Sequence, residues 1–327
     1  MAATQVLCMG NAIVDIIARV EDSFLEKHDR VKGSMMLVDA ETSATIYADM
    51  PPAMERSGGS AGNTAAAIAS FGGSAGYIGK VHDDQLGGVF CHDIRAAGVS
   101  FETSFAKNGA PTATSMILVS PDAQRTMNTF LGACTELTPD DVDEATVSAA
   151  EILYVEGYLW DTPTMKAAVL KAYDLAHKAG RKVSLSLSDS FCVGRFRDEF
   201  MDLVENQVDI LFANEDEILS LFEVDNLDAA FEKLQAIGKL AAITLGENGS
   251  AVISGGEVIR INAMPATVED TTGAGDLYAA GFLFGLTNGK SLEDCAKLGG
   301  MAAAEVISHL GARPDVNLGD LAKKTFG

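Results

Sequence analysis

The sequence predicts an α/β protein with a central, mostly parallel sheet flanked by helices in three layers, together with a second, smaller β-sheet. Three short apolar runs, at residues 152–155, 183–187 and 208–212, have the length of buried strands, and helix-length segments separate them. Residues 15–50 and 99–133 break this rhythm, and the second of these segments alternates like antiparallel strands. We therefore expect these two segments to form the small sheet, outside the βα repeat.

The N-terminal part of the large sheet is expected from two further apolar runs. Residues 6–9 form the first run and residues 75–79 the second, and an Ala-rich helix near residues 65–70 lies between them. Asp84 has the position of a helix N-cap, and Gly98 closes the helix that follows it. This order continues the alternation of strands and helices.

Turn and cap residues place the remaining elements. Thr162 followed by Pro163 is typical of an N-cap followed by proline in the first helical turn. Residues 242–245 and 250–253 flank a Gly-containing turn, which predicts a hairpin. The Gly- and Ala-rich segment 292–309 predicts a closely packed final helix.

The composition excludes several classes of partner. The chain has 327 residues, of which 47% are hydrophobic, and 24 Lys and Arg against 46 Asp and Glu give a net charge of −22. This acidity, without any dense basic run, argues against nucleic acids and anionic membranes as partners. The five cysteines are scattered with no CxxC pair, which favours reduced thiols. With no basic leader at residues 1–5 and no apolar run near the ~20 residues of a membrane span, we expect a cytoplasmic protein.

One stretch, residues 268–276, joins a strand-like pattern to a helix-like one. Bare N–H groups at the start of a helix favour an anion, and small Gly and Ala side chains let a phosphate come close. Asp276, in the first helical turn, is well placed to take a proton from a hydroxyl that attacks such a phosphate. Each feature also has an ordinary structural explanation, since Thr271 or Thr272 fits an N-cap and Asp276 complements the helix dipole.

Four other positions carry candidate chemistry. Asp15 stands alone in an apolar segment, and a buried carboxylate needs partners. Close packing explains the glycines and alanines of residues 57–64 but not Asn63. The acids of residues 214–217 open a helix, where they either complement its dipole or hold a hydrated Mg²⁺. Arg125 is either a solvated turn residue or a phosphate contact.

Residues 270–276, Asp-Thr-Thr-Gly-Ala-Gly-Asp, resemble the second signature of the ribokinase/phosphofructokinase-B family of small-molecule kinases, and residues 57–64 resemble the first. The matching motifs extend from residue 10 to about residue 311. The resemblance implies a ribokinase-like fold in which the small sheet is a lid over the acceptor site. The lid would comprise residues 15–50 and 99–133, and the large domain residues 1–14, 51–98 and 134–327.

The resemblance also implies a role for each matching position. Asp276 would be the catalytic base, with Gly273, Ala274 and Gly275 as the anion hole and Arg125 reaching the transferring phosphate. The residues expected to bind the acceptor are Asn11, Asp15, Gly58, Gly59 and Asn63. Those expected to bind the nucleotide are Asn214, Thr244, Gly246, Gly249 and Thr272. Asn214 and Glu217 would hold Mg²⁺ through water.

The expected partners are ATP and a small nucleoside or sugar with a primary hydroxyl. Residues 58–63, 154–159 and 209–215 are similar to those of family members that phosphorylate the 5′-hydroxyl of adenosine, and Leu159 stands where some of them stack an aromatic ring on the base. Ribose, fructose or a related sugar is the alternative acceptor. ATP and Mg²⁺ are the expected cofactors, with room for a monovalent cation such as K⁺, and the protein is expected to be a monomer or homodimer.

Three other classes of protein fit the sequence less well. Gly273-x-Gly275 could begin the G-x-G-x-x-G motif of a dinucleotide-binding oxidoreductase, but Tyr278 occupies the third glycine position. No G-x-x-x-x-G-K-[ST] motif is present, which argues against a P-loop kinase. A non-catalytic sugar- or nucleoside-binding protein is the more distant alternative, and the joint presence of Asp276, Asn214 and Glu217 argues against it.

Overall fold

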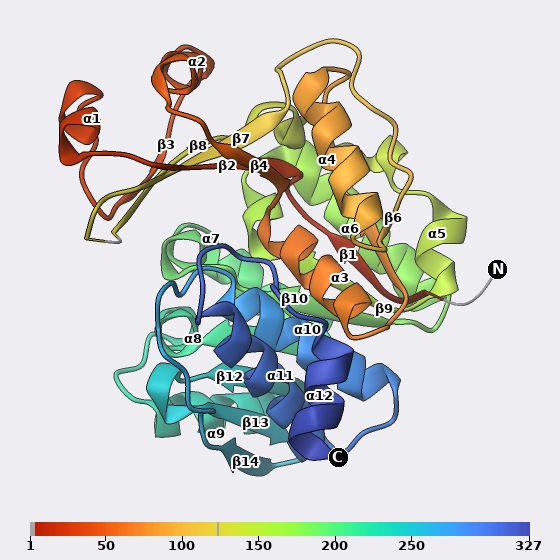
Figure 1. Ribbon diagram of the computed structural model, residues 1–327. Helices are drawn as coiled ribbons and strands as arrows, with labels where there is room; N and C mark the ends of the chain where they lie inside the picture. Colours follow the sequence, from red (N-terminus) through yellow and green to blue (C-terminus); the bar gives the residue numbers. More distant parts are fainter. Residues whose placement is uncertain (1–3, 123) are drawn as a thin grey trace.

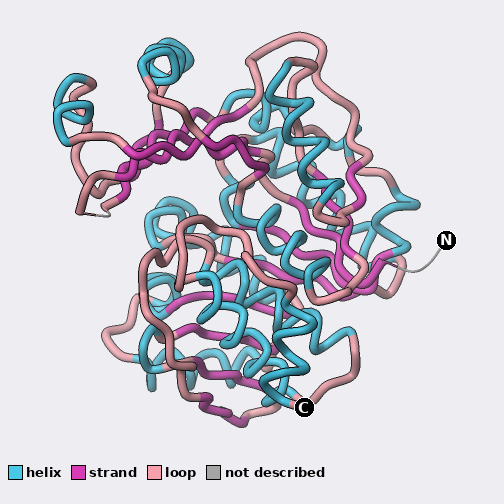
Figure 2. The backbone as a smooth tube through the Cα atoms, viewed as in Figure 1, coloured by secondary structure: helices cyan, strands magenta, loops and turns pink. Residues whose placement is uncertain are grey.

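The computed structural model describes residues 4–122 and 124–327, and its larger sheet is a wide, mostly parallel layer (Figures 1 and 2). Parallel pairing connects its strands from β12 to β6, and only β13 and β14 are antiparallel, at one edge. The strand order is β14 (Glu257–Ile261), β13 (Ser250–Ser254), β12 (Leu240–Thr244), β11 (Ile210–Asn214), β10 (Lys182–Ser186), β9 (Ala150–Glu156), β1 (Thr4–Met9), β5 (Ala75–Ile78) and β6 (Ser100–Phe101). The predicted fold class is confirmed.

Helices cover both faces of this sheet, and the strand residues alternate between the two hydrophobic cores. In β1, Val6 and Cys8 face one core while Leu7 and Met9 face the other. The first face carries α3 (Ser60–Ser70), α4 (Gln85–Ala96), α10 (Ala274–Thr287), α11 (Leu292–Val306) and α12 (Leu318–Phe326). The second carries α5 (Glu144–Ala149), α6 (Pro163–Lys178), α7 (Ser190–Asn206), α8 (Glu215–Phe222) and α9 (Leu227–Ile237).

The helix boundaries follow from local caps. The side chains of Asp84 and Thr162 accept from the backbone at the starts of α4 and α6, as predicted. Short 3₁₀ turns connect several elements, at Gly132–Glu136, Pro139–Asp141, Gly157–Trp160 and Gly246–Asn248. The helix expected over residues 292–309 ends at Val306, and α12 follows it. No strong pattern in the sequence predicts α12, in which Leu318 is the one buried residue.

The second sheet lies to one side of the large one, in the order β3 (Met35–Leu37), β8 (Arg125–Phe130), β7 (Ala113–Val119), β2 (Ile13–Arg19) and β4 (Met54–Ser57) (Figure 1). β7 and β8 pair antiparallel as expected, whereas β2 and β7 are parallel. Two short helices, α1 (Asp22–Lys27) and α2 (Ala40–Asp49), connect its strands, and Ile46 of α2 is buried in a core with Met116 and Leu118 of β7. One face of the small sheet is therefore covered by its own segment.

The membership of this sheet differs from the expected segments at two strands. β4 pairs with β2, although residues 54–57 were assigned to the large domain. β6 pairs with β5 in the large sheet, although residues 100–101 were assigned to the small one. Both strands are short, and Met-Glu-Arg-Ser in β4 has no alternation strong enough to reveal its pairing. In the described ranges, no helix combines the length and the apolar character needed to cross a bilayer.

Candidate active site

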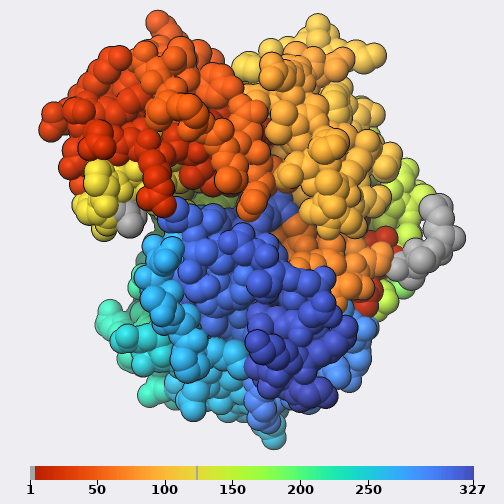
Figure 3. Space-filling model, viewed as in Figure 1, coloured from red at the N-terminus to blue at the C-terminus, as the bar shows by residue number. Residues whose placement is uncertain are grey.

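A cavity of about 1500 Å³ lies between the small sheet and the carboxyl ends of the parallel strands. Figure 3 shows the red and yellow segments of the small sheet overhanging the blue C-terminal part. Ligands of open α/β sheets bind outside these strand ends, and single small-molecule sites usually occupy roughly 300–1,000 Å³, so this cavity has room for two ligands. The lining residues that follow or end the parallel strands are Asn11, Glu156, Ser186, Asn214 and Thr244.

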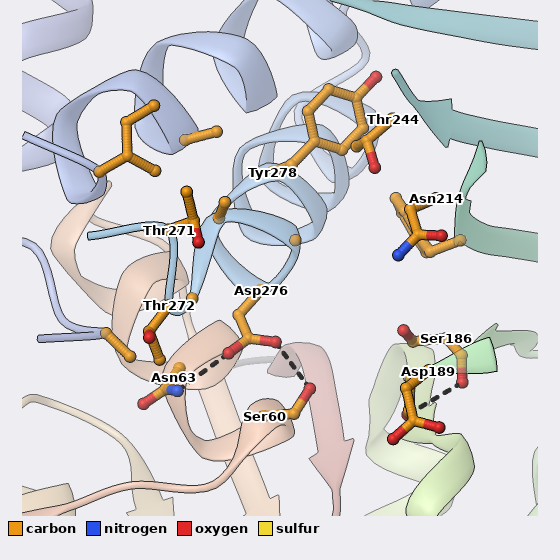
Figure 4. A pocket seen from close by; sticks show the side chains of 18 of the residues that line it. Ser60, Asn63, Ser186, Asp189, Asn214, Thr244, Thr271, Thr272, Asp276 and Tyr278 are labelled. Atoms are coloured by element: carbon orange, nitrogen blue, oxygen red, sulfur yellow. Dashed lines mark hydrogen bonds between the residues drawn. The ribbon is translucent and has the colours of Figure 1, made fainter. Parts of the chain in front are cut away.

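Asp276 lies in the middle of this cavity, in the first turn of α10 (Figure 4). Its two carboxylate oxygens accept hydrogen bonds from Ser60 Oγ at 2.7 Å and from Asn63 Nδ2 at 2.9 Å. Burial raises the pKa of Asp276, and these two donors and the Arg313 guanidinium partly oppose the rise. The site thus contains a carboxylate that is held in one orientation and binds a proton more readily than an exposed aspartate would.

The turn before α10 presents backbone amides beside Asp276. Gly273 is the N-cap with a φ of +80°, a conformation that favours glycine, and an added Cβ would come within 2.8 Å of Ala312 Cβ. The first N–H groups of a helix have no acceptor within the helix, so those of α10 are available to an anion. Gly273, Ala274 and Gly275, the three predicted anion-hole residues, all line the cavity.

The predicted acceptor residues meet at one end of the cavity. Asn11, Asp15, Gly59 and Asn63 line it, and the Oδ1 atoms of both asparagines have no hydrogen-bond partner among the described residues. Burial raises the pKa of Asp15 to about 7, although Arg313 and Arg125 oppose the rise. These unused acceptor atoms fit a ligand that carries several hydroxyl groups.

Gly58 is not among the cavity-lining residues; it lies behind Asp15 instead. A Cβ at residue 58 would come within 2.3 Å of Asp15 Oδ2. The absence of a side chain therefore allows the Asp15 carboxylate to occupy its place at the cavity wall. Gly58, the first glycine of this motif, therefore adjoins Asp15 rather than the cavity, whereas Gly59 lines the cavity directly.

Glu156 is a buried carboxylate at the end of β9 that the sequence analysis did not single out. It is 1% exposed, and it accepts from Asn11 N and Ala61 N, both at 2.8 Å. Burial raises its pKa to about 7, and the two amides partly oppose this. Glu156 therefore fixes the backbone on both sides of the acceptor end. No periodic pattern marks it, because the apolar strand β9 simply ends in one charged residue.

The predicted nucleotide-binding residues lie at the other end of the cavity. Thr244, Gly246 and Gly249 belong to the hairpin formed by β12 and β13, and Asn214 ends β11 beside Thr244. Figure 4 shows Asn214 and Thr244 across the cavity from Ser60 and Asn63. The two predicted groups of binding residues therefore face each other, with Asp276 between them.

Asn214 and Glu217 form a reciprocal helix cap as well as lining the cavity. Asn214 Oδ1 accepts from Glu217 N at 2.8 Å, and Glu217 Oε2 accepts from Asn214 N at 3.0 Å. Burial raises the pKa of Glu217 to about 7. The described residues contain no cluster of three or more side chains able to cage a metal. This donor set fits Mg²⁺ that keeps its waters and binds together with phosphates.

Arg125 and Thr272 contact each other beside the turn. Arg125 Nη1 donates to Thr272 Oγ1 at 3.0 Å, and Arg125 Nη2 forms an ion pair with Asp270. Thr272 lines the cavity, whereas Arg125 is not among the lining residues. Arg125 of the small sheet therefore contacts the turn at residues 270–273, which precedes α10, rather than projecting into the open cavity. We call this segment the phosphate-side turn.

Several other lining residues were also missed. Ser60 donates to Asp276, and Ser186 and Asp189 follow β10 at the same edge as Asn214. Position at the carboxyl end of a parallel strand was the available signal for the latter two. Leu159 is fully buried in the second core, and its neighbour Tyr158 faces the cavity, so an aromatic side chain is present there after all.

Positive charge is scarce in the cavity. Among the described residues, Lys297 and Arg195 are the cationic side chains that line it, and each pairs with a carboxylate, Glu293 and Asp161 respectively. A polyanionic ligand would therefore rely on backbone amides and an accompanying cation for charge compensation.

Comparisons with known proteins agree with this geometry. The model of the pfkB family of carbohydrate kinases matches residues 44–317. The chain is 54% identical to the crystallised adenosine kinase of Sinorhizobium meliloti, with a TM-score of 0.91, and 51% identical to a probable sugar kinase of Rhizobium etli, with a TM-score of 0.92; each match covers 99% of both chains. It is 32% identical to 5-dehydro-2-deoxygluconokinase of Bacillus subtilis over 77% of this chain and 80% of that protein. The chain therefore belongs to the pfkB family of carbohydrate kinases, which transfer a phosphoryl group from ATP to an alcohol.

Proposed function

We propose that the protein transfers the γ-phosphoryl group of ATP to the 5′-hydroxyl of a nucleoside, with adenosine as the leading acceptor and AMP as the product. The observation that carries this proposal is the position of Asp276. Its carboxylate is fixed by Ser60 and Asn63, adjoins the amide-lined turn, and lies between two groups of binding residues. A proton acceptor beside an anion site is what in-line transfer to a hydroxyl requires.

In the proposed reaction, Asn11, Asp15 and Asn63 orient the acceptor so that its primary hydroxyl meets Asp276. The carboxylate takes the hydroxyl proton while the oxygen forms a bond to the γ-phosphorus, and the bond to the β-phosphate oxygen breaks to release ADP. The amides of Gly273, Ala274 and Gly275 compensate the charge on the transferred group. Asn214 and Glu217 would hold Mg²⁺ through water beside the triphosphate, and the ion would offset part of the triphosphate charge.

The small sheet supports a nucleoside rather than a free sugar as the acceptor. Its cavity face is mainly apolar, although Ser115 and Thr129 also line it, and the side chains of Met35 and Leu37 remain about half exposed, at 49% and 55%. The other apolar residues of that wall are Ile13, Ile117, Met127 and Leu131. A planar base would cover this surface, whereas a sugar alone would leave it in water. The similarity to an adenosine kinase over the full chain points the same way.

A sugar acceptor is the second candidate, because the chain is equally similar to a probable sugar kinase. Asp15 and the asparagines would bind the hydroxyls of either ligand, so they do not discriminate between the two. The discriminating feature is the apolar wall, which contacts the part of the acceptor beyond the ribose.

We also propose that the small sheet is a lid over the acceptor end. Its other face packs against α2, as shown by the burial of Ile46 with Met116 and Leu118. The cavity face is left for a ligand, which favours a lid over a dimer interface formed through either face. Closing it would expel water from around Asp276 and suppress hydrolysis of ATP.

The experiment that tests the proposal is ADP release from Mg-ATP with a panel of acceptors, followed by identification of the phosphorylated product. Adenosine, other nucleosides, ribose, fructose and 5-dehydro-2-deoxygluconate form the panel. Adenosine should give the largest kcat/KM, and 5′-deoxyadenosine, which lacks the reacting hydroxyl, should give no product. Turnover of a sugar with none of adenosine would establish the second candidate instead.

A further inference from the structure

An ion pair connects the small sheet to the phosphate-side turn. Arg125 is the first residue of β8, and Asp270 begins the turn that ends at α10. Their side chains are 8% and 3% exposed, so both charges are withdrawn from water. Such a pair is strongly coupled, since removing one partner leaves the other charge buried without compensation.

Asp270 also determines the shape of the turn. Its Oδ1 accepts from Thr272 N at 3.1 Å, and its Oδ2 accepts from Gly311 N at 3.0 Å. Arg125 adds a contact to the Thr272 hydroxyl at 3.0 Å. The guanidinium and the carboxylate together hold the residues immediately before Gly273, where the anion-binding amides begin.

We propose that Arg125 and Asp270 are a positioning pair that couples closure of the small sheet to assembly of the phosphate-binding turn. This inference rests on the proposed phosphoryl transfer. With the small sheet closed, the guanidinium compensates Asp270 and fixes Thr272. With the small sheet withdrawn, Asp270 loses its counter-charge and the turn loses two of its contacts. The amides are therefore aligned for the γ-phosphate only when the acceptor end is covered.

The coupling gives the lid a role in the chemical step. A lid that only excluded water would affect hydrolysis of ATP, but would leave the geometry of the anion site unchanged. Here the same strand that covers the acceptor also holds the turn that binds the phosphate. Loss of the pair should therefore lower kcat more than it weakens binding of either substrate.

The test compares Arg125→Ala, Arg125→Lys, Asp270→Asn and the double variant Arg125→Ala/Asp270→Asn with the parent protein. Arg125→Ala should lower kcat about 10²-fold, as expected for misalignment of a reacting group by about 1 Å. The KM of the acceptor should rise by a smaller factor, because Arg125 also lowers the pKa of Asp15. Arg125→Lys should recover part of the loss. The double variant should be less impaired than the product of the single effects, because neither charge is then unpaired.

Lys80→Ala is the matched control. Lys80 and Asp141 form another partly buried ion pair, with side chains 12% and 8% exposed, and neither residue lines the cavity. This variant should lose stability comparably to Arg125→Ala while retaining kcat. Millimolar guanidinium ion should restore activity to Arg125→Ala, with choline at equal ionic strength as the control, and should not increase the activity of Lys80→Ala.

Equal loss of kcat in Lys80→Ala and Arg125→Ala, or unchanged kcat in Arg125→Ala and Asp270→Asn, would overturn the coupling. The proposed function is checked separately by the turnover of the parent protein. If the parent phosphorylates no acceptor, hydrogen exchange still tests the pair. Amides of residues 271–275 should exchange faster in Arg125→Ala than in the parent and Lys80→Ala, and unchanged exchange would overturn the inference.

Discussion

At the scale of single residues, the site depends on carboxylates whose surroundings favour the protonated form. Asp15, Glu156 and Glu217 all have pKa values raised to about 7 by burial, and burial also raises the pKa of Asp276. Each is partly compensated by donors or by a nearby guanidinium. Asp15, Glu156 and Glu217 therefore ionise near neutral pH, and Asp276 ionises above the ordinary range of an aspartate.

This predicts the pH dependence of the reaction. Asp276 must be deprotonated to accept the hydroxyl proton, and Asp15 must be ionised to accept hydrogen bonds from two hydroxyls. Because burial raises the pKa of Asp15 to about 7 and also raises that of Asp276, kcat/KM should increase as the pH rises towards about 7 and level off above it. Initial rates at subsaturating acceptor, with Mg-ATP saturating, measure this profile. A rate that is constant throughout this range, or that falls as the pH rises, is incompatible with the assigned base.

The same raised pKa values have a consequence for the folded state without ligands. A carboxyl whose pKa is higher in the folded than in the unfolded protein stabilises the fold below its ordinary pKa, and this contribution is lost as the pH rises through the folded value. For Asp15, Glu156 and Glu217 that window extends from their ordinary values to about 7. Above pH about 7, where these carboxyls are ionised, they contribute least to the free energy of unfolding. Such a loss of stability is typical of functional sites.

At the scale of elements, the positions of the site residues depend on how the turn before α3, strand β2 and the start of α10 meet. The approach to α3 provides the clearest example, because Gly58 leaves room for Asp15 of β2. The start of α3 then carries Ser60 and Asn63 to Asp276 of α10. Three elements that are distant in the sequence therefore position one proton-transfer site.

Gly58→Ala should disturb the acceptor and leave the nucleotide unaffected. The new Cβ would lie within 2.3 Å of the present position of Asp15 Oδ2, so the carboxylate must move from the cavity wall. We expect the acceptor KM to rise about tenfold, the equivalent of one lost hydrogen bond, with an unchanged KM for ATP. Steady-state kinetics with each substrate varied in turn measure this.

Gly88→Ala is the control for that substitution. An added Cβ at Gly88, within α4, meets no atom within 4 Å, and alanine is the better helix former. Its kinetics should match those of the parent. An acceptor KM that is the same in Gly58→Ala and Gly88→Ala would show that Asp15 tolerates the added methyl group or does not bind the acceptor.

Local patterns in the sequence predicted most of these elements, but not the contacts between them. Gly273 to Asp276 was identifiable because a small-residue turn and a following helix leave a local signature. Glu156 and the Arg125–Asp270 pair were not, since their roles depend on partners far away in the sequence. Alternation also could not determine which sheet β4 and β6 would join, because strands of four and two residues carry too little pattern.

At the scale of the whole molecule, a rigid sheet and a smaller sheet enclose the two ends of one cavity. The chain carries a net charge of −22, and its cavity has few cationic side chains. In the proposed reaction, binding of a triphosphate would therefore depend on amides, on Mg²⁺ and on closure that removes water. The proposed lid, rather than a cluster of surface lysines, would provide the electrostatic conditions for transfer.

Hydrogen exchange should reveal this closure. In Asp276→Asn, used to prevent turnover, adenosine should slow exchange in β2, β3, β7 and β8 and leave the central strands β9 to β12 nearly unchanged. The reason is that the apolar face of the small sheet gains a ligand to pack against. Protection confined to residues 244–276 would contradict the lid proposal and favour the small sheet as an interface between subunits.

The most direct test of the central claim is the formation of AMP from adenosine and Mg-ATP by the parent protein and by Asp276→Asn. Calorimetry should first establish that both proteins bind adenosine. If Asp276 is the catalytic base, the parent should form equimolar AMP and ADP. The rate of the variant should be lower by a factor of about 10²–10⁴ or more. AMP formation by Asp276→Asn at close to the parental rate, or a parent that binds adenosine without phosphorylating it, would contradict the account.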